Sequence, residues 1–167
     1  ATAQSVDTFP IPVGNLDRKQ NESFRTLADL LETGETVRWG DRGQTLVKGG
    51  TPETEFNAAR YEVRQPRVAL YKPYTADMDT GWTQCMLDYY RVPYTLVRNS
   101  DFASGDLRDR FDVVILASQS PASILNGTPY GELLMRGPKP GLPSEPRSYQ
   151  RAEYTGGIGV TGLAALE

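Results

Sequence analysis

The stretch from Arg67 to Pro121 constrains the fold more than any other part of the chain, because β-rich apolar segments alternate there with a helical one. Val68–Tyr71 and Val113–Ala117 have the composition of buried strands, and Tyr94–Arg98 reads as a strand between them. Strands that are separated by helical segments favour a parallel sheet with helices packed on its faces. The sequence therefore predicts an α/β fold.

An amphipathic helix is expected between the first two of these strands, from Gly81 to about Arg91, with Asp79 or Thr80 as its cap. It should end before Pro93, because proline disfavours a helical conformation at the preceding residue. Side chains at helical spacing are expected to face the sheet and form the core. These side chains are Trp82, Cys85, Met86 and Tyr89.

Three regions are expected along the chain: an extended arm at 1–20, a helix-plus-hairpin subregion at 21–65, and the α/β domain at 66–167. In the subregion, the expected elements are a helix from Asn21 to about Leu31, strands Thr36–Trp39 and Thr45–Val47, and a helix at about Glu53–Arg60. In the domain, the remaining expected elements are a helical turn at Leu107–Phe111, a loop from Ser118 to Ala152, and a helix beginning at Gly159.

Three strands make a small sheet for this fold class, since doubly wound sheets commonly have five or more. The helical pattern after Gly159 is still running at Glu167. We therefore expect the α/β domain to be incomplete and truncated at its C-terminus. The open edge of the sheet is then covered by other domains of a longer parent chain or by a neighbouring copy.

The chain contains no histidine and one cysteine. A Cys/His zinc site, a Ser-His-Asp triad and a Cys-His dyad cannot be built from such a chain alone. General acid–base chemistry would depend on Asp, Glu, Lys or Tyr, whose ordinary pKa values lie far from neutrality. We therefore expect neither independent catalysis nor a cofactor.

The net charge of −3 argues against a nucleic-acid partner, because such proteins normally present a basic face. No run of about 18 apolar residues is present, so no membrane span is expected. The first residues also lack the charged start and apolar block of a signal peptide. A single cysteine allows no internal disulfide and leaves the compartment open.

Two sequence features have structural interpretations that outweigh the functional ones. Gly157–Gly162 matches the dinucleotide-binding pattern G-x-G-x-x-G, which needs a preceding strand and an acidic residue about 20 positions later. Neither is present, so a loop leading into a helix is the better interpretation. Cys85 lies inside the expected helix rather than at a strand-to-helix turn, which favours core packing over a nucleophilic role.

Candidate binding residues follow the first and third strands, because ligands of open α/β sheets bind at the carboxyl ends of strands. They are Tyr74, Thr75, Asp77 and Asp79 after the first strand, and Ser118, Gln119 and Ser120 after the third. The D-x-D spacing could hold a cation weakly, but two carboxylates are too few to indicate a metal site. The alternative is that Asp79 lies at the helix entry and that Asp77 is solvated.

Two strings in the core resemble a known family: Y-T-A-D-M-D-T-G-W-T from Tyr74 and Q-S-P-A-S-I-L-N-G from Gln119. They resemble the accessory module of large bacterial proteins of the zinc carboxypeptidase (carboxypeptidase A-like) family. In those proteins a peptidase domain is followed by a domain similar to class I glutamine amidotransferases, with a flavodoxin-like sheet. The resemblance covers about Arg67–Gly127 and Tyr154–Glu167, and more loosely Asn21–Val47.

The resemblance implies a non-catalytic structural or interaction module, with the strand-end loops as its contact surface. The family's zinc ligands include histidines, and the amidotransferase nucleophile lies in a G-x-C-x-G elbow, so neither catalytic set has a counterpart here. Parent proteins of this kind are usually exported, which implies a periplasmic or extracellular location. Two alternatives stay open, namely a small-ligand-binding domain that uses the strand-end crevice and a hydrolase built on a perturbed carboxylate or tyrosine.

Overall fold

The computed structural model describes residues 16–74, 77–127 and 156–167. The chain divides into two compact units. Unit 1 comprises Ala1–Gln65 with Tyr89–Val92, and unit 2 comprises Pro66–Asp88 with Pro93–Glu167. Unit 1 contains a three-stranded antiparallel sheet and unit 2 a three-stranded parallel sheet, so the fold is mixed α/β.

Unit 1 is built around its antiparallel sheet, whose strand order is β2-β1-β3. Its elements are α1 (Asn21–Glu32), β1 (Val37–Trp39), β2 (Thr45–Val47), α2 (Glu53–Ala58) and β3 (Tyr61–Val63). The expected hairpin of β1 and β2 is confirmed. The third strand was not predicted, because three residues between Arg60 and Arg64 carry too short a pattern to be recognised.

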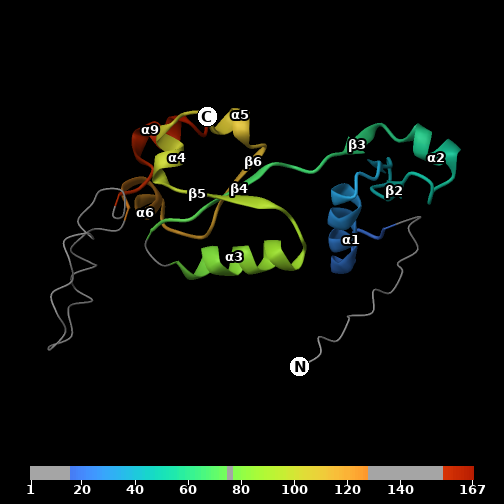
Figure 1. Cartoon of the computed structure of the whole chain (residues 1–167), viewed down its shortest axis with the longest axis horizontal. Helices are drawn as coiled ribbons and strands as arrows, with labels where there is room; N and C mark the ends of the chain where they lie inside the picture. The colour runs from blue at the N-terminus through green and yellow to red at the C-terminus, as the bar shows by residue number, and fades with distance from the viewer. Residues whose placement is uncertain (1–15, 75–76, 128–155) are drawn as a thin grey trace, which may run out of the picture. The chain divides into compact units, whose positions relative to one another are not determined.

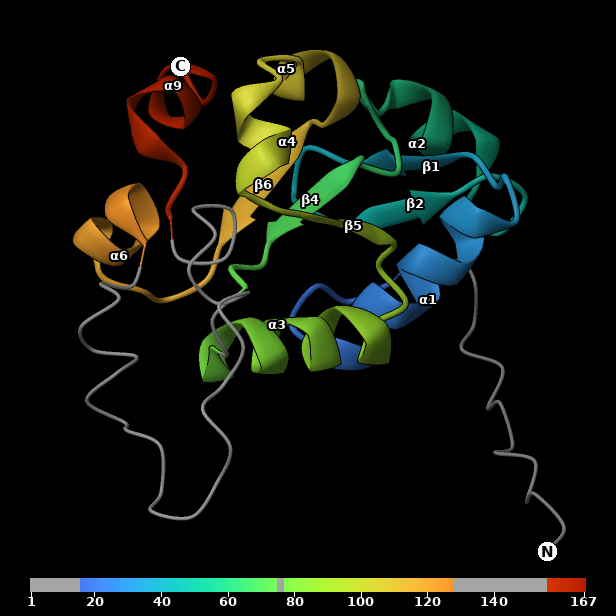
Figure 2. The same ribbon diagram turned by 60° about the vertical axis from the view of Figure 1, so that its left-hand side comes forward.

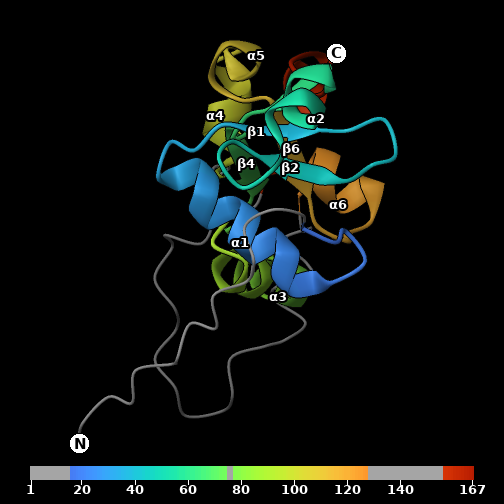
Figure 3. The ribbon, with the colours of Figure 1, turned by 90° about the vertical axis from the view of Figure 1, so that its right-hand side faces the viewer.

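Strands β1 and β2 of unit 1 lie between two helices. Figure 3 shows α1 on one side of β1 and β2 and α2 on the other, and Phe56 of α2 packs with Leu46 of β2. Leu16 is 1% exposed and forms a bridge with Thr45. Leu16, at the described end of the expected N-terminal arm, is therefore held against the sheet, whereas residues 17–20 are exposed. The rest of that arm lies outside the described residues.

Unit 2 contains all three predicted parallel strands, in the order β5-β4-β6. Its elements are β4 (Val68–Tyr71), α3 (Met78–Tyr89), β5 (Tyr94–Val97), α4 (Asn99–Ala103), α5 (Leu107–Arg110), β6 (Val113–Leu116), α6 (Pro121–Asn126) and α9 (Gly159–Ala164). None of the helices in the described ranges has the length and apolar character needed to cross a membrane.

The two faces of the parallel sheet are covered unequally. Figures 1 and 2 show α3 on one face and α4, α5 and α9 on the other. On the second face Ala69, Tyr71 and Val97 form a core with Phe102 of α4, whose ring meets that of Tyr71 edge-to-face at 5.2 Å. That face holds the main hydrophobic core of unit 2.

The expectation that the apolar residues of α3 face the sheet is wrong. Trp82 is 64% exposed, Met86 59% and Tyr89 52%, and Cys85 is also exposed. Thr80 is the buried residue of the helix, and Trp82 comes two residues later, which places it about half a turn around the axis. The spacing identified a true stripe, but spacing alone cannot tell which side of a helix is covered.

The covered side of α3 is polar. The carbonyl oxygen of the Gln84 side chain accepts a hydrogen bond from Lys72 Nζ at 2.8 Å, and Gln84 Nε2 donates to Tyr94 Oη at 3.3 Å. The helix also begins at Met78, three residues before the predicted start. Its inward-facing positions are therefore satisfied by hydrogen bonds and the helix leaves its apolar stripe uncovered.

Two short helices, α4 and α6, were not predicted. Helix α6 falls within the expected loop from Ser118, the rest of which lies outside the described residues beyond Gly127. Its sequence signal was present, because Ser120 caps it by accepting from Ser123 N at 3.0 Å and Pro121 is its first residue. A helix of six residues has too little periodicity to be recognised from its apolar pattern, so the cap was the one usable signal for it.

The glycines of the Gly157–Gly162 segment allow α9 to pack closely. A side chain at Gly157 would overlap the backbone of Ile124 and Leu125, and one at Gly162 would approach Phe102 and Ile158. Gly159 has a φ of +65°, a conformation that favours glycine. Close packing therefore explains Gly157 and Gly162, and the backbone conformation explains Gly159. The expected loop leading into a helix is confirmed, since α9 begins at Gly159.

Candidate functional site

Asp77 lies at the carboxyl end of the parallel sheet, in the segment between β4 and α3. Its Oδ2 accepts hydrogen bonds from the backbone N of Thr80 at 2.8 Å and from the Thr80 hydroxyl, so it caps α3. The prediction that Asp79 or Thr80 forms the cap is therefore wrong, and Asp77 is half-buried rather than solvated. The carboxylate is held by the helix it starts.

The pKa of Asp77 reflects two opposing effects. Partial burial pushes the pKa up, but the hydrogen bonds from Thr80 and backbone N–H groups, together with the nearby side-chain amide of Gln119, outweigh it, and the pKa is lowered. Asp77 is thus a carboxylate near neutral pH and has no proton to donate. Gln119 follows β6, so the loops after β4 and β6 come together here.

The Gln119 side chain lies beside Asp77 without forming a good hydrogen bond. Its Nε2 is buried and has no hydrogen-bond partner among the described residues. The amide is therefore close enough to lower the pKa of Asp77 electrostatically, although its geometry falls short of a formed bond. A buried, unsatisfied donor of this kind is uncommon in folded proteins.

The other predicted residues are spread over the same end of the sheet. Asp79 is exposed in the first turn of α3 and Ser118 is exposed after β6, whereas Ser120 is engaged as the cap of α6. Tyr74 is 44% exposed, with the Arg98 guanidinium carbon 4.7 Å from the centre of its ring. Thr75 lies outside the described residues.

Arg98 belongs to this region and was missed from the sequence. It directly follows β5, and its Nη1 donates to the carbonyl oxygens of Lys72 at 2.7 Å and Pro73 at 2.8 Å. The side chain therefore ties the ends of β4 and β5 together. Its position directly after a strand could have indicated a place in this region. The hydrogen-bond partners of a long flexible side chain, however, cannot be predicted from sequence spacing.

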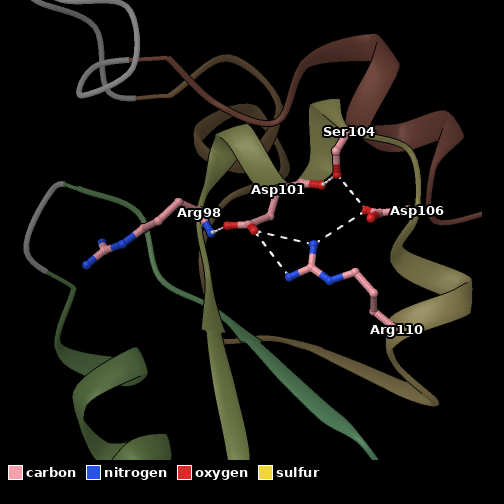
Figure 4. A network of polar contacts seen from close by, with 5 residues as sticks. All are labelled: Arg98, Asp101, Ser104, Asp106 and Arg110. Atoms are coloured by element: carbon pink, nitrogen blue, oxygen red, sulfur yellow. Dashed lines mark hydrogen bonds and ion pairs between the residues drawn. The ribbon is translucent and has the colours of Figure 1, made fainter.

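A polar network on the opposite side of Arg98 fixes its backbone (Figure 4). Arg98 N donates to Asp101 Oδ2 at 2.8 Å, and Arg110 bridges Asp101 and Asp106 at 3.4 Å. The pKa of Asp106 is lowered chiefly by a hydrogen bond from Ser104 and, to a smaller extent, by the hydrogen bond and positive charge of Arg110. Figure 4 shows the Arg98 guanidinium pointing away from this network, toward the loop after β4.

Two of the described groups at the strand ends are engaged with neighbouring groups. Asp77 is engaged with Thr80, and Arg98 with two carbonyl oxygens. Cys85 is exposed in the middle of α3 and not at a strand-to-helix turn. Within residues 16–74, 77–127 and 156–167, no cluster of three acidic or Cys side chains is placed to hold a metal ion.

Comparison with known proteins finds no matching family model, no similar curated protein and no similar solved structure. The function must therefore be argued from the residues and their geometry.

Proposed function

We propose that this chain is a non-catalytic structural or interaction module of a zinc carboxypeptidase-like protein, and that it contacts its partner domain through α3. The observation that carries the proposal is the exposed apolar stripe on that helix. The stripe, called here the α3 surface, consists of Met78, Trp82, Cys85 and Met86. Met78 is 74% exposed, and an apolar cluster that water covers this fully is typical of a contact site.

The strand order supports the finer proposal of a flavodoxin-like, amidotransferase-like fold. In the flavodoxin-like order 2-1-3-4-5, strands β5, β4 and β6 correspond to strands 2, 1 and 3. A complete sheet of that kind has a fourth strand beside strand 3, which is β6 here. On this edge strand Val113 is 43% exposed and Leu116 37%. An apolar edge without a charged or proline residue is one that proteins usually cover.

The α3 surface also changes the expected contact region. A flat apolar face favours a protein partner, whereas a deep polar-lined pocket favours a ligand. Met78, Trp82 and Met86 of α3 are each more exposed than Tyr74, the large apolar side chain described in the loop after β4. We therefore place the contact on the helix, although the resemblance alone suggested the loops.

Cys85 provides a direct test, because it is the only cysteine of the chain and lies within the α3 surface. A thiol reagent should label it rapidly in this chain alone. Adding the peptidase domain encoded in the same gene should slow the labelling in a saturable way. Trp82→Ser should weaken this protection at least tenfold, since exposed aromatic residues often dominate such contacts.

Val160→Ser is the matched control. Val160 is 83% exposed on α9, on the other face of the sheet, so its replacement should leave the protection unchanged. Labelling that stays fast at every concentration of the peptidase domain would contradict the proposal. The absence of a peptidase domain from the gene would contradict the family assignment but not the role of the α3 surface.

A small-ligand-binding role is the second candidate, and the buried Nε2 of Gln119 beside Asp77 is the observation that favours it. The ligand would be a small polar molecule that accepts from this amide. Calorimetric titration with divalent cations and small polar ligands tests it, with Gln119→Leu as the variant that should lose binding. Flat traces with the unaltered chain would rule this candidate out.

An independent hydrolase is the third candidate function, and it is tested by assaying the purified chain for hydrolysis of peptides and of glutamine. We expect no turnover, because Asp77 is held ionised by its hydrogen bonds and cannot act as a general acid. Turnover that survives Asp77→Asn would point to a different residue, and turnover of any kind would overturn the non-catalytic assignment.

A further inference from the structure

Unit 1 contains an open hollow of about 660 Å³ beside the hairpin turn. The bridge between Leu16 and Thr45 brings the segment Asp17–Lys19 next to the turn of the hairpin. Asp17 then closes a tight turn by accepting from Lys19 N at 2.9 Å. Two segments distant in sequence thus line one hollow, which is called here the basic hollow.

The side chains around the basic hollow carry an excess of positive charge. Arg18, Lys19 and Arg42 line it together with one carboxylate, Asp17, which leaves two positive charges in excess. The whole chain has a net charge of −3, so this concentration of cations runs against its overall composition. None of the three cations forms an ion pair with any residue in the described ranges.

Arg18 is held in place without being neutralised. Its guanidinium carbon lies 4.3 Å from the ring centre of Trp39, within the range of a cation–π contact. Such a contact orients the guanidinium while its N–H groups stay available for an anion. Gly43 leaves room for it, because a side chain at that position would come within 3.2 Å of Arg18 Nη1.

The hollow is bounded by groups that would select its ligand. Phe24, 44% exposed, forms an aromatic wall. Arg42 also lines a second hollow of about 310 Å³, whose other charged lining residues, Asp41 and Glu55, are acidic and repel anions. Of the two hollows that Arg42 lines, only the basic hollow has an excess of positive charge and would attract an anion.

We propose that the basic hollow binds a small anion that carries at least two negative charges, such as a phosphoryl group or a dicarboxylate. The excess of two positive charges matches such a ligand, and Arg18 and Arg42 have the planar donor geometry that phosphate and carboxylate oxygens accept. This site lies within unit 1 and is independent of the proposed contact through α3. Its test therefore gives an answer whether or not the α3 surface binds a partner.

The test is a titration of the ¹⁵N-labelled full chain at low and constant ionic strength with inorganic phosphate, pyrophosphate and succinate in turn. Saturable shifts are expected at the backbone amides of Arg18, Lys19 and Gly43. A response to the phosphates alone would identify a phosphoryl site and one to succinate alone a carboxylate site. A response to all three would indicate a general dianion site, and each of these results supports the proposal.

Charge variants test whether the hollow itself is responsible. Arg42→Gln and Lys19→Gln should each weaken binding about fivefold, roughly the effect of one charge about 4 Å away in a site that is open to water. Asp17→Asn should tighten it by a similar factor, and its side-chain oxygen can still accept from Lys19 N. Neither Arg42 nor Lys19 forms a described side-chain hydrogen bond, so their replacement should leave the fold intact.

Arg60→Gln is the matched control, because Arg60 is an exposed cation of unit 1 that does not line the hollow. The Arg60→Gln variant should bind the anion as tightly as the unaltered chain does. The proposal is overturned if no anion gives a saturable shift, if sodium chloride at equal ionic strength gives the same shifts, or if Arg60→Gln weakens binding as much as Arg42→Gln.

Discussion

Asp77 shows at the scale of a single residue how the strand-end loop is held. Its carboxylate accepts from the backbone N and the hydroxyl of Thr80, so Asp77→Ala leaves the first turn of α3 without its cap. We expect the free energy of unfolding to fall by about 1 kcal/mol, as for other N-cap replacements. Denaturation in urea, followed by circular dichroism, measures it.

The control for this prediction is Asp79→Ala, two residues further along the same turn. Asp79 is exposed, and no described hydrogen bond uses its carboxylate, so the change should stay within about 0.5 kcal/mol. Asp77→Asn should retain most of the stability, because asparagine is also a good N-cap. Equal losses in Asp77→Ala and Asp79→Ala would show that Asp77 does not cap α3 in solution.

Arg67 and Asp112 form the strongest charge pair at the start of the parallel strands. Hydrogen bonds from the Arg67 side chain and backbone N, at 2.8 Å to each carboxylate oxygen, hold the pKa of Asp112 at about 2, below its usual 3.8. A lowered folded-state pKa gives a stabilisation that is present above about pH 4 and lost as the pH falls toward 2.

Asp112→Asn should therefore flatten the loss of stability between about pH 4 and pH 2. Urea denaturation midpoints measured through this range should fall more steeply for the unaltered chain than for the variant. The difference should be modest, because both side chains are exposed and the pair is screened by solvent. Parallel pH profiles would mean that the pair does not persist in solution.

At the scale of elements, replacing two different glycines by alanine should change the stability in opposite directions. A side chain in Gly157→Ala would overlap the backbone of Ile124 and Leu125, which cannot move aside as a flexible side chain can. We expect a loss of about 1–3 kcal/mol, typical of overpacking. In Gly81→Ala the new methyl group meets no atom within 4 Å and lies inside α3, so helix propensity should add roughly 1 kcal/mol.

Both glycine variants can be compared by the same thermal or urea denaturation. Effects of the same sign would contradict the prediction. A stabilising Gly157→Ala in particular would mean that α9 does not pack on α6 as described.

The sequence was most informative for elements with a strong, local pattern. Strand β4 has the predicted bounds because a run of only four apolar residues between polar neighbours is typical of a buried strand and too short for a helix. Short elements such as β3 and α4 carry too little periodicity to be recognised, and their formation depends on packing partners. The orientation of α3 depended on which side the sheet covers, which is a tertiary property that the helical spacing of Trp82 does not contain.

The candidate site divides in the same way. The general rule for strand ends led to the loops of Asp77 and Gln119, which the fold brings together. The sequence does not show which of these groups caps a helix, which one links two loops and which one stays unpaired. Those roles depend on distances that differ by a few tenths of an ångström. Arg98 was missed for this reason, since its role comes from two carbonyl oxygens of a loop 25 residues and more before it.

At the scale of the whole molecule, the apolar surface is distributed in an unusual way. Leu70 of β4 is fully buried, yet Trp82, one of the two tryptophans of the chain, is mostly exposed. Exposed large apolar side chains add little to folding, because they bury little area. The contact proposed for α3 predicts that these side chains contribute to association instead, and the two contributions can be measured separately.

We expect the double variant Trp82→Ser with Met86→Ser to unfold within about 0.5–1 kcal/mol of the unaltered chain, as exposed sites usually do. It should also show weaker concentration-dependent association in sedimentation velocity and bind less hydrophobic dye, because the α3 surface is the apolar area open to both. Leu70→Ser, at a residue with 0% exposure, should instead destabilise the fold severely. If the double variant is destabilised as much as Leu70→Ser, these side chains pack inside the molecule in solution, and the contact proposed for α3 loses its basis.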